Sequence, residues 1–304
     1  MSDVKARVKE AVGPEWQARA RALSRLRWFA KYRVMRHSGA RLRDDPARNL
    51  AYVLWDPELE SHTYDVANLD ELADFLAAEF GVDRARALEH LREPESDPVF
   101  NEDWRRRMRF RFDVKRRAQL ANRLIWWGLV RSLRPQLIVE CGIFNGVGSL
   151  VLLRALARNR EEGAPGRLLS IDSDPTMGWA VPSELQADWT TVEGFTSDVL
   201  ESSIDGKRVD ILIHDTPHTY ENQMLEFSAA LRYPAELLVL IDSSGGQTPA
   251  LEELCAAHGG RYRYFRERPK DHFYPGNGSG IGIFNGGADG AAQRRAETGS
   301  DSTV

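Results

Sequence analysis

From Gln136 onward, short apolar runs alternate with segments of helical periodicity, and this alternation constrains the fold more than any other feature. The runs are LIVE (137–140), LLSI (168–171), TTVEGF (190–195), VDILIH (209–214) and ELLVLI (236–241). Strands that alternate with helices predict a parallel sheet covered by helices on both faces. Two further strand-like runs, over 261–267 and 280–284, complete a predicted seven-stranded, doubly wound, Rossmann-like α/β sheet.

The N-terminal part of the chain follows other patterns and predicts an α-rich cap. Apolar residues at helical spacing over 15–36 and 69–80 predict amphipathic helices, and residues 49–66 predict a β-hairpin. The polar, proline-containing stretch 93–103 predicts a linker. We therefore expect the cap and its hairpin to be built from the first 118 residues.

Two further parts follow in the predicted domain organisation. After the cap at 1–118, residues 119–286 are expected to form the α/β domain. Residues 287–304 are rich in Gly, Ala, Ser and charged residues, and a segment of this composition has too little apolar surface to fold. We expect this tail to be disordered.

Charge is distributed unevenly along the cap. Residues 1–48 carry a net charge of +8 and residues 50–103 a net charge of −12, although the whole chain has a net charge of only −4. Such blocks can pair within a fold or across a homo-oligomer, which we expect here. A pI near 6.0 is unlike that of a dedicated nucleic-acid-binding protein, so no nucleic-acid partner is expected.

Several classes of protein do not fit the composition. No apolar run reaches the roughly eighteen residues that a membrane span needs, and the first residues lack the apolar core of a signal peptide. The two cysteines, Cys141 and Cys255, lie too far apart to indicate a disulfide framework or a metal-binding motif. These observations favour a cytoplasmic protein without a membrane span.

The segment VECGIFNGVGSL, residues 139–150, is the strongest chemical motif. Its glycines allow a sharp turn and a close approach to a ligand, and the helix that follows offers free N–H groups at its N-terminus. An acidic residue followed by G-x-x-x-G resembles motif I of the class I S-adenosylmethionine methyltransferases. That resemblance implies that Glu140, Gly142, Gly146 and Ser149 line the methionine end of the cofactor S-adenosyl-L-methionine.

The same glycine spacing also resembles the nucleotide loop of short-chain dehydrogenases. Those enzymes need a Tyr-x-x-x-Lys pair, and none of the eight tyrosines here is followed by lysine four residues later. Their glycine loop also opens the chain, whereas about 120 residues precede it here. The methyltransferase interpretation is therefore favoured.

Two acidic residues at later strand ends are candidate cofactor ligands. Asp172 ends the run LLSID, and ligands of open α/β sheets bind outside the carboxyl ends of the strands, so it is the candidate ribose ligand. Asp174 is near enough to replace it. Asp198 stands where the methyltransferase family holds the adenine amino group, although Ser197 could serve and a helix cap is an equally natural role.

The segment HDTPHTY (214–220) predicts the acceptor side of the site. Its Asp-x-x-His-x-Tyr pattern resembles the methyltransferase branch that includes macrolide-sugar O-methyltransferases and cephalosporin-hydroxylase-like proteins. By that resemblance Asp215 and His218 are catalytic, with His218 as the base. Asp215 and Asp242 end neighbouring strands and could hold Mg²⁺ through hard oxygen ligands. Relatives have a third ligand where this chain has Ser243, so metal-assisted and metal-free mechanisms both remain open.

The sequence thus predicts an S-adenosylmethionine-dependent methyltransferase. Its expected acceptor is a hydroxyl on a small molecule of sugar or natural-product type. Two alternatives remain open, a metal-independent N-methyltransferase and a non-catalytic, cofactor-binding scaffold protein.

Overall fold

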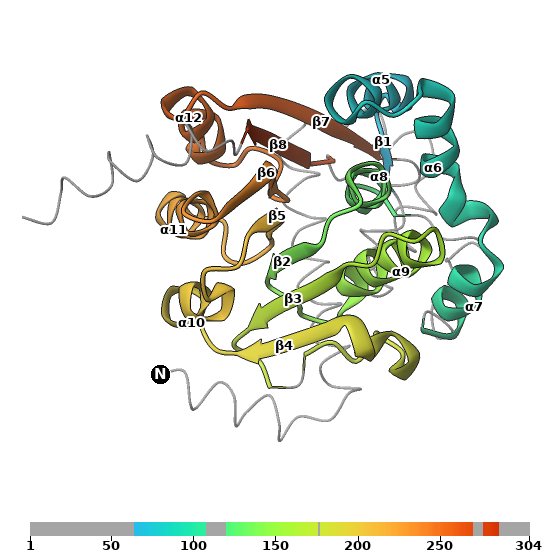
Figure 1. The fold of residues 1–304 in the computed structure, drawn as a ribbon, viewed down its shortest axis with the longest axis horizontal. Coiled ribbons are helices and arrows are strands. Elements are labelled where there is room, and N and C mark those ends of the chain that lie inside the picture. The colour runs from blue at the N-terminus through green and yellow to red at the C-terminus, as the bar shows by residue number, and fades with distance from the viewer. Residues whose placement is uncertain (1–63, 108–119, 176, 270–275, 286–304) are drawn as a thin grey trace, which may run out of the picture.

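A single mixed sheet organises the computed structural model, which describes residues 64–107, 120–175, 177–269 and 276–285 (Figure 1). Its strand order is β1-β7-β8-β6-β5-β2-β3-β4. The strands are β1 (Tyr64–Val66), β2 (Leu137–Cys141), β3 (Arg167–Asp172), β4 (Trp189–Glu193), β5 (Val209–His214), β6 (Pro234–Asp242), β7 (Arg261–Pro269) and β8 (Gly278–Asn285). Strands β2 to β6 pair in parallel, whereas β8 is antiparallel to both β6 and β7. This arrangement confirms the predicted α/β fold class.

Among the described residues the sheet has eight strands, so the predicted count of seven is wrong by one. The additional strand, β1, pairs antiparallel with β7, and Tyr64 lies opposite Pro269. Its partner is therefore about 200 residues away in the chain, and no local pattern reveals a pairing over that separation. The first arm of the predicted hairpin lies outside the described residues, as do the predicted helix at 15–36 and the predicted tail at 287–304.

Helices cover both faces of the sheet (Figure 1). On one face lie α10 (Thr196–Ile204), α11 (Tyr220–Leu231) and α12 (Ala250–Ala257). On the other face lie α8 (Arg123–Leu133) and α9 (Val147–Glu161). Beside them lie α5 (Leu69–Phe80), α6 (Arg84–Ser96) and α7 (Pro98–Arg107). A 3₁₀ helix, η2 (Ser183–Asp188), precedes β4. Among the described helices, none combines the length and the hydropathy that a membrane span requires.

Local capping signals explain where α5 begins and ends. The side-chain oxygen of Asn68 accepts a hydrogen bond from the backbone N–H of Glu71 at 3.2 Å, and the Asn68 amide donates to the Glu71 carboxylate at 3.1 Å. Gly81 ends the helix in the left-handed conformation, with φ +66°. The helix predicted over 69–80 is therefore confirmed, and Asn68 and Gly81 cap its two ends.

The linker predicted at 93–103 is wrong. Residues up to Ser96 belong to α6, and α7 begins at Pro98. The Asp97 carboxylate accepts the backbone N–H groups of Val99 and Phe100, both at 2.9 Å, and a proline suits the first position of a helix because it has no N–H to satisfy. Phe100 and Trp104 are fully buried, so this polar-looking segment contributes core residues.

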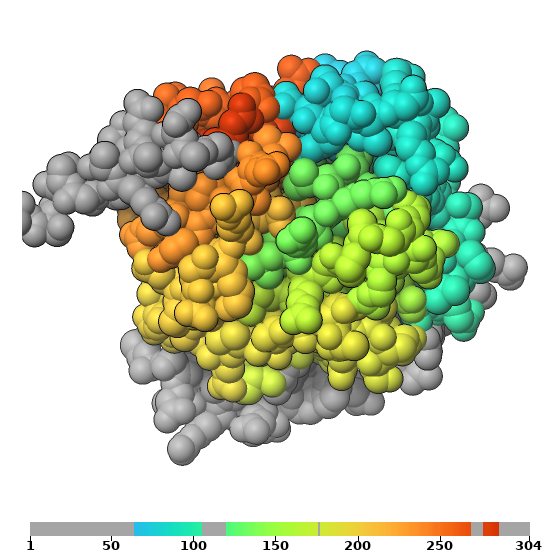
Figure 2. Space-filling view, viewed as in Figure 1, coloured from blue at the N-terminus to red at the C-terminus, as the bar shows by residue number. Residues whose placement is uncertain are grey.

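Two hydrophobic cores lie on opposite faces of the sheet, and the alternation of side chains along each strand separates them. Ile211 and Ile213 of β5 face α8 and α9, whereas Leu212 faces the layer of α10 to α12. The first core also contains residues of α5, α6 and α7. In the space-filling view these N-terminal helices, coloured blue to teal, lie directly against the green α8 and α9 (Figure 2).

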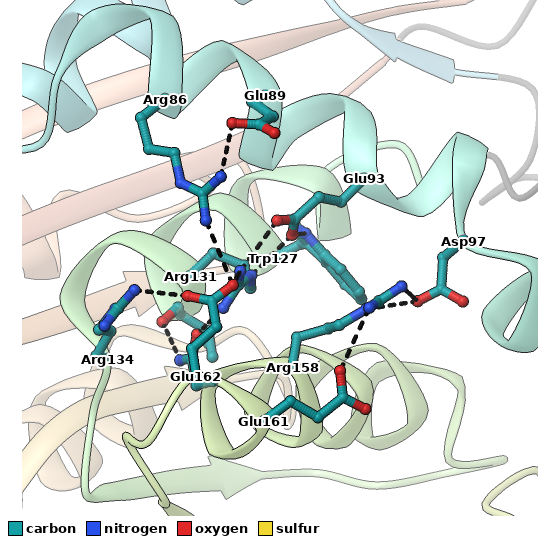
Figure 3. A network of polar contacts seen from close by, with 12 residues as sticks. Arg86, Glu89, Glu93, Asp97, Trp127, Arg131, Arg134, Arg158, Glu161 and Glu162 are labelled. Atoms are coloured by element: carbon teal, nitrogen blue, oxygen red, sulfur yellow. Dashed lines mark hydrogen bonds and ion pairs between the residues drawn. The ribbon is translucent and has the colours of Figure 1, made fainter.

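A buried arginine joins three of the helices on the face of the sheet that α8 and α9 cover (Figure 3). The Arg131 side chain of α8 is fully buried, and its Nε and Nη2 donate to the two carboxylate oxygens of Glu93 in α6 at 2.7 and 3.0 Å. Its Nη2 also donates to Glu162, the residue that follows α9, at 2.5 Å, and its Nη1 donates to Asn159. Trp127 adds a hydrogen bond to Glu93 at 3.2 Å. The network fixes α6 and α9 to α8.

Removing Arg131 should therefore destabilise the protein strongly. We expect Arg131→Met to lower the free energy of unfolding by about 3 kcal/mol, because it leaves Glu93 and Asn159 without their buried partner. Arg232→Met, which removes a surface ion pair with Glu201, should cost less than about 1 kcal/mol. Urea titration of both variants measures the difference, and equal losses would contradict a structural role for the buried network.

Candidate functional site

A cavity of about 530 Å³ opens at the carboxyl ends of four parallel strands. Gly142 follows β2, Asp172 ends β3, Gly194 follows β4 and Asp215 follows β5. The chain crosses to the other side of β2 between β4 and β5, so the cavity lies at the point where the strand order reverses. The lining residues are Gly142, Ile171, Asp172, Ser173, Gly194, Phe195, Thr196, Ser197, Asp215, Thr216, Pro217, Thr219 and Asn222. A volume of this size suits a small-molecule ligand.

Two glycines of the predicted motif are required by the backbone path. Gly142 has φ +97°, and a Cβ there would lie 2.3 Å from the backbone oxygen of Asp215. Gly146 has φ +84° at the start of α9, and a Cβ there would lie 2.7 Å from the Cα of Gly178. Gly142 lines the cavity, whereas Gly146 packs against the segment around Gly178.

Asp172 lines the cavity and also holds the glycine loop. One oxygen of its carboxylate accepts the backbone N–H groups of Ile143 and Phe144, each at 2.8 Å. Its other oxygen accepts the backbone N–H of Asp174 at 2.9 Å, and Asp174 itself does not line the cavity. A carboxylate has about four acceptor positions, so one position of Asp172 remains for a ligand in the cavity.

Glu140 and Ser149 lie behind the glycine loop and not on the cavity wall. Glu140 is 1% exposed, and its carboxylate accepts hydrogen bonds from the hydroxyls of Ser149 at 2.6 Å and Ser170 at 2.7 Å. Burial raises the pKa of Glu140 to about 7, although the two serine donors oppose this shift. The structure therefore gives both residues a supporting position beneath the loop.

After the next strand, β4, Ser197 and not Asp198 reaches the cavity from the first turn of α10. Asp198 is an exposed residue in the first turn of α10, and its carboxylate accepts a hydrogen bond from the Ser197 hydroxyl at 2.9 Å. The sequence reasoning did not single out Phe195 and Thr196, which also line the cavity. Phe195 is 66% exposed in the structure, whereas its aromatic side chain at the end of the run TTVEGF gave the sequence no sign of this exposure.

The two residues of the predicted pair, Asp215 and Asp242, do not stand opposite each other in the register of β5 and β6. Asp242 lies opposite His214 in the register of β5 and β6, so these two side chains share the face that α11 covers. Asp215 comes one residue later than His214 and follows the opposite alternation. Its carboxylate accepts a hydrogen bond from the Ser243 hydroxyl at 2.6 Å. The strand ends thus pair Asp215 with Ser243 and Asp242 with His214.

His214 is a site residue that the sequence reasoning missed, because it reads as the last residue of a buried strand. Potential ligand atoms of His214, His218 and Asp242 lie within 4.8 Å of one another. His214 and His218 face each other through Nε2 and Nδ1 at 3.1 Å. Sequence spacing pointed to His218 and Asp242, but nothing local distinguishes a functional from a packing histidine in VDILIH.

These side chains do not suit Mg²⁺. Mg²⁺ prefers oxygen ligands, whereas two of the three grouped residues are imidazoles. The Asp242 carboxylate already accepts hydrogen bonds from the Gln223 amide at 3.0 Å, from Ser244 through its N–H and hydroxyl, and from the Gly246 N–H at 3.2 Å. The arrangement therefore does not support the predicted metal role of Asp215 and Asp242.

His218 does not line the cavity itself, but it lies between two residues that do, in a form suited to a base. Its neighbours Pro217 and Thr219 both line the cavity. Burial lowers the pKa of His218, and the nearby His214 lowers it further, against the opposing carboxylates of Asp215, Asp242 and Glu226. The imidazole is therefore neutral at neutral pH and can accept a proton.

Comparison with known proteins finds a family similar to the central part of the chain. Residues 139–242 match the family described as "Methyltransferase domain", which confirms the resemblance carried by the glycine motif. A search of curated proteins found no match. Among solved structures, the O-methyltransferase TomG from Streptomyces achromogenes, in complex with SAM, is 16% identical over 72% of this chain and 97% of that chain, with a TM-score of 0.44. An O-methyltransferase from Bacillus cereus, in complex with SAH, is 14% identical over 70% and 96%, with a TM-score of 0.41.

The raised pKa of Glu140 predicts a pH-dependent stability. Between the ordinary carboxyl value near 4.5 and a folded-state value of about 7, the folded protein binds one proton that the unfolded chain has released. The free energy of unfolding should therefore fall as pH rises through this window. Glu140→Gln removes this dependence, and its stability relative to wild type should increase by about 3 kcal/mol from pH 4.5 to pH 7. Urea denaturation at several pH values measures this difference, and parallel pH profiles of the two proteins would contradict the assignment.

Proposed function

Because residues 139–242 match a methyltransferase family, we propose that this chain transfers the methyl group of S-adenosylmethionine to a hydroxyl oxygen of a small molecule. One observation carries the proposal: a single cavity joins the glycine loop at Gly142, the carboxylate of Asp172 and the strand end at Asp215, and His218 stands in the chain between its lining residues Pro217 and Thr219. The loops at four strand ends thus bring a cofactor wall and a base together.

The cofactor wall offers a contact for each part of S-adenosylmethionine. Gly142 leaves room for close approach of the methionine portion, and the remaining acceptor position of Asp172 suits a ribose hydroxyl. Phe195 offers an aromatic face beside the hydroxyls of Thr196 and Ser197, which suits an adenine ring. When bound, the cofactor supplies an electrophilic methyl group on a positively charged sulfur.

The acceptor side is proposed to lie around His218. A hydroxyl oxygen must lose its proton when it forms the new bond to carbon, and neutral His218 can take that proton. The site would contribute chiefly by holding the oxygen in line with the methyl group. An acceptor of sugar or natural-product type is proposed from the resemblance of the segment HDTPHTY alone, and a homo-oligomer stays a prediction from the charge blocks.

Cofactor binding provides the first test. Calorimetry should detect micromolar binding of S-adenosylmethionine or its demethylated product, and Phe195→Ala should weaken it about fivefold, the worth of roughly 1 kcal/mol of aromatic contact. Val99→Ala, an exposed residue of α7, is the matched control and should bind as wild type does. Folded wild-type protein that releases no heat with either ligand would overturn the proposed function.

Turnover provides the second test. With a labelled methyl donor and a panel of hydroxylated metabolites, His218→Ala should reduce kcat by about 10²–10⁴-fold, the usual contribution of a positioned base. His258→Ala, a half-buried histidine at the end of α12, should retain the wild-type kcat. Activity should survive EDTA because the donors at the strand ends do not suit Mg²⁺. Wild-type turnover by His218→Ala would remove this histidine from the mechanism.

A further inference from the structure

A buried carboxylate and two imidazoles form a continuous chain of hydrogen bonds from α11 to the cavity edge. The Glu226 carboxylate lies 2.7 Å from Nδ1 of His214, and Nε2 of His214 lies 3.1 Å from Nδ1 of His218. Glu226 and His214 are both fully buried, whereas His218 is half-buried. Building on the proposed function, we propose that Glu226 and His214 are positioning residues that hold His218 in the tautomer whose Nε2 is free to accept the acceptor's proton.

Glu226 sets the direction of every hydrogen bond in this chain. Its Oε1 accepts the hydroxyls of Thr196 and Thr216, each at 2.7 Å, and the amide of Asn222 at 3.3 Å. Its Oε2 faces His214. A carboxylate surrounded by donors acts only as an acceptor, so the proton between Glu226 and His214 belongs to Nδ1 of His214.

The tautomer of His218 follows from that of His214. A neutral imidazole with its proton on Nδ1 presents a lone pair at Nε2. His218 must then donate through its own Nδ1, and its lone pair is left on Nε2. Edge-to-face contacts of the His214 ring with His218 and with Phe227, at centroid distances of 5.1 and 5.8 Å, limit rotation of the ring. The same logic operates wherever a carboxylate orients a catalytic histidine.

The chain can also receive the charge that methyl transfer releases. As the acceptor oxygen bonds to the methyl carbon, its proton moves to Nε2 of His218, and the proton on Nδ1 of His218 moves to Nε2 of His214. His214 then carries the positive charge that the sulfonium loses, next to the negative charge of Glu226. The products are a neutral methyl ether, a neutral thioether and one imidazolium, so atoms and charge balance.

Four other groups complete the electrostatic surroundings of this chain. Asp242 of β6 and Asp215 after β5 face His218, and both raise its pKa. Cys141 of β2 lies beside Glu226, and burial raises the pKa of its thiol well above the usual value, so the thiol adds no charge. Gln223 of α11 donates to the Asp242 carboxylate at 3.0 Å and so supplies it with a buried partner.

The decisive variant is Glu226→Gln. Thr196, Thr216 and Asn222 all donate toward Oε1, so the glutamine oxygen should stay there and the amide nitrogen should face His214. The amide would donate to Nδ1 of His214, whose proton would move to Nε2. His218 would then accept at Nδ1 and carry its proton on Nε2. A change of one oxygen to nitrogen should thus reverse both tautomers and remove the free lone pair.

Long-range ¹H–¹⁵N correlation spectra of the full chain test this directly. We expect His218 of the wild type to carry its proton on Nδ1, and His218 of Glu226→Gln to carry it on Nε2. His214→Phe, which removes the acceptor for His218, should also lose the Nδ1-protonated form. A wild-type His218 protonated on Nε2 alone would overturn the proposal. This readout does not require a known acceptor, so it decides the proposal even if the proposed function fails.

Kinetics provide the complementary readout once an acceptor is known. Glu226→Gln and His214→Phe should each lower kcat at least tenfold and change KM by less than about twofold, since neither residue lines the cavity. Glu201→Gln, a surface residue of α10 paired with Arg232, is the matched control and should have the wild-type kcat. Wild-type kcat in both buried variants would overturn the proposal. Loss of activity in EDTA that a transition metal restores would also overturn the proposal, because the two imidazoles would then be metal ligands.

Discussion

The close contact between the glycine loop and the end of β5 is the constraint on which the rest of the site depends. Gly142 approaches Asp215 so closely that a Cβ would overlap its backbone oxygen, and the N–H of Asp215 donates to the carbonyl of Cys141 at 2.8 Å. The N–H of Gly142 donates in turn to Ile171 of β3, also at 2.8 Å. These bonds hold the ends of β2, β3 and β5 at fixed spacing. The cavity and the histidines beside it are placed by that spacing.

The two-residue period of the strands then sorts side chains by role. Glu140 and Ser170 face the layer of α8 and α9, where they support the glycine loop from below. His214 and Asp242 face α11, where buried polar partners hold them. A shift of one residue in register would exchange these sets and place a carboxylate where an imidazole now stands. The chemistry of the site is therefore determined by the same register that fills the two cores.

The sequence was sufficient for the fold class and for the parts of the site that depend on strand ends. Apolar runs, glycine positions and the residues after each run are local signals, so the strand ends at Gly142, Asp172 and Asp215 could be predicted. The direction of the side chains could not be predicted. Asp215 and Asp242 differ by one position in the register of β5 and β6, and only the pairing of the two strands reveals this difference. Glu226 looked like an ordinary helix residue, because three of its four hydrogen-bond partners, Thr196, His214 and Thr216, lie ten or more residues away in the chain. The predicted linker at 93–103 was wrong because its polar, proline-containing composition concealed the start of a helix at Asp97 and Pro98.

The buried guanidinium of Arg131 has a consequence for how much of this chain constitutes a folding unit. Its main carboxylate partner, Glu93, comes from a segment that precedes the predicted α/β domain in sequence, and Phe100 of the same region stacks on Trp127 of α8. A fragment that began near residue 119 would leave a charge in an apolar layer with half of its partners missing, and would expose an indole ring to water. The domain boundary predicted at residues 118 and 119 therefore does not separate two parts that unfold independently. The helices before it belong to the core of the domain that they precede.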